Sequence, residues 1–111
     1  IESDYRFKVI IIIILNFPEL YYAFEKQLNN INFTNNSLHE VKEVIFSIIK
    51  NNSDVSYTQL VESLKEKDLI KFLGDFRLEA IFSKLRSSDE KVKIDESREV
   101  LEELIYMVNN N

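Results

Sequence analysis

The chain contains no cysteine and only one glycine, one proline and one histidine in 111 residues. The lack of cysteine excludes disulfide bonds, thiolate zinc sites and a cysteine nucleophile, which fits a reducing cytosol. Sheets with tight turns usually use more glycine and proline than this, whereas helices joined by short polar loops need few. The scarcity of both residues therefore favours an all-α fold before any spacing is considered.

The residues that are present indicate a single globular domain. Apolar residues make up 45% of the chain and charged residues 30%, which is typical of neither a disordered nor a membrane protein. The apolar run from Val9 to Leu15 is far shorter than the roughly 20 residues that span a bilayer, so no membrane contact is expected. A start at Ile1, without a secretory leader, predicts a cytoplasmic fragment of a larger protein.

The formal net charge is −5, and the lysines are dispersed among acidic residues. A protein that binds nucleic acid through its phosphates needs clustered Lys and Arg, so direct nucleic-acid binding is disfavoured. The dispersed cations are Lys42, Lys50, Lys65, Lys67, Lys71, Lys84, Lys91 and Lys93.

Apolar residues recur at helical spacing along most of the chain. The isoleucine run of the first segment has strand propensity, but no second strand-like run exists to pair with it, so a helix is predicted. Ser3 and Asp4 offer N-caps for this helix. The expected helices cover residues 3–16, about 18–31, about 37–50, about 56–67, 69–86 with a bend or split at Gly74, and about 95–108.

Helix ends are marked by local signals. Phe17 followed by Pro18 disfavours continuing the first helix, and proline suits the first turn of the next. The third and fourth helices open with Ser-x-x-Glu and Ser-x-x-Gln capping boxes at Ser37 and Ser56. Asp68 marks the break after the fourth helix. We expect a bundle of about six helices, with residues 1–86 as the bundle and 87–111 as a C-terminal helix or helical hairpin.

No catalytic or metal-binding motif is complete. His39-Glu40 begins the zinc-protease pattern, but Glu43 stands where the second histidine belongs. Paired carboxylates such as Glu102 and Glu103 indicate a solvent-exposed helix face. No cofactor is expected. A small helical enzyme would instead need a deep polar pocket that gathers several acidic residues, namely Asp54, Asp75, Glu79 and Glu99.

Several segments together resemble the C-terminal helicase-binding domain of bacterial DnaG-type DNA primases. The resemblance is carried by Leu15-Asn16-Phe17-Pro18-Glu19-Leu20, by Ile31-Asn32-Phe33, by Leu38-His39-Glu40-Val41 through Ile45, and by Tyr57, Leu60 and Leu64. It covers nearly the whole chain, although its motifs are hydrophobic spacings rather than invariant catalytic residues. The N-terminal domain of the replicative helicase has similar spacing, so a self-associating helicase collar remains the alternative.

The resemblance implies an adaptor for DNA replication that has no enzymatic activity of its own. It would dock the primase onto the N-terminal domains of the hexameric replicative DNA helicase within the primosome, and alone it would be a monomer. The parent chain would be a DNA primase that makes RNA primers. The positions that the resemblance assigns to helicase binding are Lys84, Leu85, Arg86, Arg98, Leu101, Glu102, Leu104, Ile105, Tyr106 and Met107.

Overall fold

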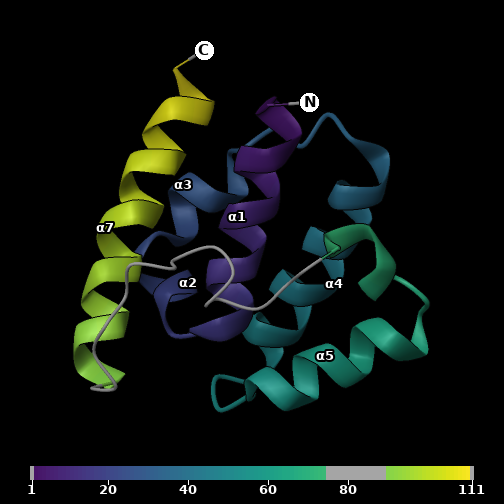
Figure 1. Ribbon diagram of the computed structural model, residues 1–111. Helices are drawn as coiled ribbons and strands as arrows, with labels where there is room; N and C mark the ends of the chain where they lie inside the picture. Colours follow the sequence, from purple (N-terminus) through teal and green to yellow (C-terminus); the bar gives the residue numbers. More distant parts are fainter. Residues whose placement is uncertain (1, 75–89, 111) are drawn as a thin grey trace.

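In the computed structural model, which describes residues 2–74 and 90–110, the chain is an all-α bundle without strands among those residues. A central helix, α1, is flanked by α7 on one side and α4 on the other, and α5 packs against both α1 and α4 (Figure 1). The helices are α1 (Glu2–Asn16), α2 (Leu20–Ala23), α3 (Glu25–Asn29), α4 (Asn36–Asn51), α5 (Tyr57–Glu66), the short 3₁₀ helix η1 (Ile70–Leu73) and α7 (Glu90–Asn109). The all-α prediction is confirmed.

The C-terminal half of α1 is buried on every side. Each residue from Val9 to Leu15 is buried, and this run makes about two helical turns, so it covers the whole circumference. A helix that is apolar all round belongs inside a protein. Because each buried aliphatic side chain contributes roughly 1.5–3 kcal/mol, this burial outweighs the weak helix propensity of isoleucine.

The predicted second helix is divided into α2 and α3 at Phe24. Its φ and ψ of −128° and 25° interrupt the helical backbone. Both short pieces are held by tertiary contacts. Tyr21 is buried, whereas the exposed Tyr22 donates its hydroxyl proton to the Ile49 carbonyl on α4. The two adjacent tyrosines thus face different environments.

The N-caps of α4 and α5 come from different kinds of residue. The side chain of Asn35 accepts a hydrogen bond from the Leu38 amide, 3.0 Å away, so the predicted cap at Ser37 is wrong by two residues. Asparagine is as good an N-cap as serine, and it precedes the helix in sequence. The predicted capping box between Ser56 and Gln59 is confirmed by both of its hydrogen bonds.

The chain turns sharply after α5. Asp68 adopts a left-handed conformation with φ of 57°. The amides of Asp68 and Leu69 donate to the carbonyls of Lys65 and Leu64, and this pairing is a Schellman C-cap. The predicted break at Asp68 is confirmed. Gly74, with φ of 62°, ends η1 in a conformation that glycine tolerates best. The remainder of the predicted helix 69–86 lies outside the described residues.

Helix α7 runs antiparallel along α1, so the N-terminus of α1 and the C-terminus of α7 lie at the same end of the molecule (Figure 1). It begins at Glu90, earlier than the predicted start near Asp95. Leu101 and Ile105 of α7 join the same core as α1. The bundle and the C-terminal helix therefore share one core.

Candidate functional site

His39 does not belong to a metal site in the part of the chain that the structure describes. No group of three or more His, Cys, Asp or Glu side chains there is arranged to hold a metal ion. His39 is exposed near the start of α4, and its Nε2 lies 3.5 Å from Glu43 Oε1, one turn further along. This is an ordinary contact between neighbours on a helix surface.

Of the acidic residues considered for an enzyme, the structure describes only Asp54 and Glu99. Asp54 and Glu99 are both exposed, on separate elements of the fold. Asp75 and Glu79 lie outside the described residues. Asp54 and Glu99 therefore do not form a deep polar pocket together.

The inner face of α7 is part of the core. Leu101 is fully buried and Ile105 is nearly so. Ser97, one turn before Leu101, is buried on the same stripe. The resemblance assigned Leu101 and Ile105 to helicase binding, but in this fold they are covered by the bundle. The physical reason is that one apolar stripe packs α7 onto α1, so those two side chains are not available to a partner.

The outer face of α7 holds the remaining predicted positions. Arg98, Glu102 and Tyr106 are exposed, and Leu104 and Met107 are half-buried at its edge. Tyr106 is 63% exposed and is the most exposed large hydrophobic side chain among the described residues. The other assigned positions, Lys84, Leu85 and Arg86, lie outside the described residues.

Acidic groups surround Tyr106 on this outer face. Glu102 and Glu103 precede it by four and three residues, so they lie beside it on the helix surface. Within residues 93–109, the part of α7 whose burial the structure describes, the exposed carboxylates are Asp95, Glu96, Glu99, Glu102 and Glu103, whereas Arg98 is an exposed cation and Lys93 is half-buried. The described outer face of α7 is therefore acidic, with an aromatic side chain near its C-terminal end.

A second exposed tyrosine belongs to the same end of the molecule. Tyr5 is 59% exposed and lies near the N-terminus of α1. Because α1 and α7 are antiparallel neighbours, Tyr5 and Tyr106 both lie toward the end that holds the two termini (Figure 1). Exposed tyrosines are enriched where proteins meet partners. This end of the bundle is thus the best candidate for a docking surface.

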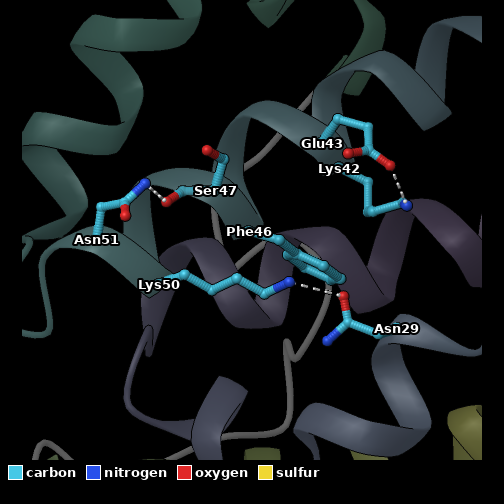
Figure 2. A pocket seen from close by; sticks show the side chains of 7 residues that line it. All are labelled: Asn29, Lys42, Glu43, Phe46, Ser47, Lys50 and Asn51. Carbon is cyan, nitrogen blue, oxygen red and sulfur yellow. Dashed lines mark hydrogen bonds and ion pairs between the residues drawn. The ribbon is translucent and has the colours of Figure 1, made fainter.

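A groove between α3 and α4 was not anticipated from the sequence. It has a volume of about 270 Å³ (Figure 2). Its lining consists of Asn29 from α3 and of Lys42, Glu43, Phe46, Ser47, Lys50 and Asn51 from α4. The only sequence signal was the spacing Lys42, Phe46, Lys50, which places these three side chains along one face of a helix.

Lys42 is the unusual member of the groove, because it is charged and only 7% exposed. Its Nζ lies 5.5 Å from the centroid of the Phe33 ring and 5.9 Å from that of Phe46, so the ammonium contacts two aromatic faces. It also donates to Glu43 Oε1 at 2.7 Å. These contacts compensate for the burial of the charge.

The pKa of Glu43 is lowered by the positive charges around it. The hydrogen bond and charge of Lys42 hold the pKa of Glu43 below its ordinary value, and the charges of His39 and Lys50 lower this pKa further. Partial burial of Glu43 acts in the opposite direction and raises this pKa, but less than Lys42 lowers it. The groove is thus a place where cations outnumber anions on a chain of net negative charge.

No helix among the described residues is long and apolar enough to cross a membrane. In comparisons of the chain with protein-family models, with curated proteins and with solved structures, nothing matches.

Proposed function

We propose that this chain is the helicase-binding domain of a bacterial DNA primase, which docks the primer-synthesising enzyme onto the hexameric replicative helicase. The identity of the partner rests on the sequence resemblance, from the Phe17-Pro18-Glu19-Leu20 junction onward. The assignment of the docking surface rests on one structural observation. Helix α7 is anchored by its inner stripe and presents Tyr106 to solvent.

The mechanism is that of a rigid helix face. Leu101 and Ile105 hold α7 against α1, so its outer face is ordered before a partner arrives. Little conformational entropy is then lost on binding. Tyr106 provides an amphipathic anchor of the kind that carries much of the binding energy at interfaces. Arg98 and Glu102 lie on the same exposed side and contribute polar contacts at the rim.

The proposal assigns no catalysis to this domain. Primer synthesis belongs to other domains of the parent primase, in the cytoplasm, and this domain requires no cofactor. The proposal also expects the domain by itself to be a monomer.

Size-exclusion chromatography with light scattering tests this proposal against the helicase-collar alternative. The chain is measured alone over a range of concentrations, and then after mixing with the replicative helicase encoded by the same genome. A constant monomer mass alone, with co-elution in the mixture, supports the primase assignment. A mass that rises with concentration, without co-elution, would favour a self-associating collar.

A further inference from the structure

The groove between α3 and α4 contains two lysines, which differ in whether their charge is paired with a carboxylate. Lys42 is paired with Glu43 at 2.7 Å. Lys50 has no ion pair among the described residues, and its Nζ makes only a long contact of 3.4 Å with Asn29 Oδ1 (Figure 2). An ammonium group has three donors, so Lys50 retains the capacity to bind an anion in the groove.

The Asn29 side chain, whose oxygen accepts the contact from Lys50, is held in place by two hydrogen bonds. The amide nitrogen of Asn29 donates to the Tyr21 hydroxyl at 2.8 Å and to the Glu25 carbonyl at 2.7 Å, so its oxygen is directed toward Lys50. In the same way, the Asn51 amide nitrogen is bonded to the Ser47 carbonyl at 2.9 Å. These bonds restrict the amide side chains that line the groove, which reduces the entropy lost when a ligand is bound.

We propose that this groove binds a carboxylate, with Lys50 as its direct partner and the edge of the Phe46 ring beside the ligand's carbon atoms. Lys42 also lines the groove, but its charge is paired with that of Glu43. The proposal is separate from docking through α7, because the groove is lined by α3 and α4 and by none of the α7 residues.

One feature favours a carboxylate over a phosphate. Lys42 is already paired with Glu43, so Lys50 is the one lysine of the groove lining without an ion pair among the described residues. Its single charge matches that of one carboxylate group, whereas a doubly charged phosphate would keep an uncompensated charge beside Glu43.

A second hollow provides the matched control. It has a volume of about 300 Å³ and is lined in part by Lys8 and Lys71. Lys71 is already paired with Asp68 at 2.8 Å, so its charge is less available. The proposal therefore expects Lys50→Gln and Lys71→Gln to behave differently, although each removes one exposed lysine.

The experiment is an NMR titration of the ¹⁵N-labelled chain at constant ionic strength, with succinate, an acetylated and amidated tetraglutamate peptide, and inorganic phosphate as the probes. Saturable shifts of the α4 amides around Phe46 and Lys50 are expected with the carboxylates. Lys50→Gln should weaken binding about tenfold, the loss expected for one hydrogen bond to a charged group. Lys71→Gln should leave binding unchanged, and Glu43→Gln should strengthen it by freeing Lys42. Circular dichroism verifies that each variant is folded.

The relative affinities of succinate and of the peptide distinguish a small free carboxylate from an acidic protein segment as the natural ligand. Binding of succinate at least as tight as that of the peptide assigns the groove to a small free carboxylate. Tighter binding of the peptide assigns it to an acidic segment of a protein. The proposal is overturned by an absence of saturable shifts, by equal losses in Lys50→Gln and Lys71→Gln, or by phosphate binding more tightly than either carboxylate.

Discussion

Among the α7 residues whose burial the structure describes, Ser97 is the one buried polar side chain. It is 1% exposed, and its hydroxyl has no hydrogen-bond partner among the described residues. A buried polar group without a partner costs free energy, because the water that it loses is not replaced. The small side chain nevertheless fits a position where a larger one would push α7 away from the core.

Ser97→Ala should therefore stabilise the protein. The substitution removes the unpaired hydroxyl, keeps the side chain small, and introduces the residue with the highest helix propensity. We expect the free energy of unfolding to rise by about 1 kcal/mol. Chemical denaturation followed by circular dichroism measures this change. A loss of stability would mean that the hydroxyl makes a favourable hydrogen bond in solution.

Lys42 illustrates at the residue scale what could not be read from the sequence. Its surroundings, Phe33 in a loop and Phe46 one turn along α4, are set by the tertiary fold. Sequence spacing could place Lys42 and Phe46 on one helix face, but not bring Phe33 to them. Lys42 therefore looked like one more dispersed surface cation.

Among the elements, α1 depends most on its surroundings. Its run of five isoleucines has the composition of a strand, and the helix prediction came from the absence of a partner strand rather than from propensity. In the protein, the run is enclosed by α4, α5 and α7. Tertiary packing thus determines the secondary structure of this segment.

An isolated peptide of residues 7–16 should consequently not be helical in water. It is apolar, β-branched and free of proline, which is the composition of segments that stack into sheets. We expect infrared spectroscopy to give the amide I band of β-sheet, with aggregation that increases with concentration. A monomeric helical peptide would contradict the view that packing imposes the helix.

Helix ends were predictable where a signal was local and unambiguous. The Ser56–Gln59 capping box and the break at Asp68 follow from a few adjacent residues. The cap of α4 was misplaced because Asn35 and Ser37 are both good candidates, two residues apart. The division at Phe24 carries no local signal, since the apolar stripe runs through it without a change of period.

The two candidate caps of α4 can be separated by substitution. Asn35→Ala should lower the free energy of unfolding by about 1 kcal/mol, because the Leu38 amide loses its acceptor. Ser37→Ala, the matched control, should change it by much less, because Ser37 lies within the helix. Denaturant titration of both variants measures the difference. A larger loss for Ser37→Ala would restore the capping box that the sequence indicated.

At the scale of the whole molecule, the antiparallel pairing of α1 and α7 gathers the two termini and two exposed tyrosines at one end (Figure 1). The sequence identified α7 as an amphipathic helix, yet an apolar stripe serves a core and a partner equally well. Leu101 and Ile105 are buried and pack α7 into the bundle, whereas Tyr106 is exposed to solvent. The proposed docking surface could be assigned only once the burial of these side chains was known.

The most direct test of the proposed function is calorimetric titration of this chain, and of its Tyr106→Ala variant, into the replicative helicase of the same genome. We expect saturable binding of a few domains per hexamer, with an affinity at least about tenfold weaker for the variant because an anchor side chain is removed. Gln27→Ala, an exposed substitution on α3, should bind as the unmodified chain does. The absence of binding at protein concentrations of tens of micromolar would contradict the primase assignment, and equal affinities for Tyr106→Ala and Gln27→Ala would contradict docking through α7.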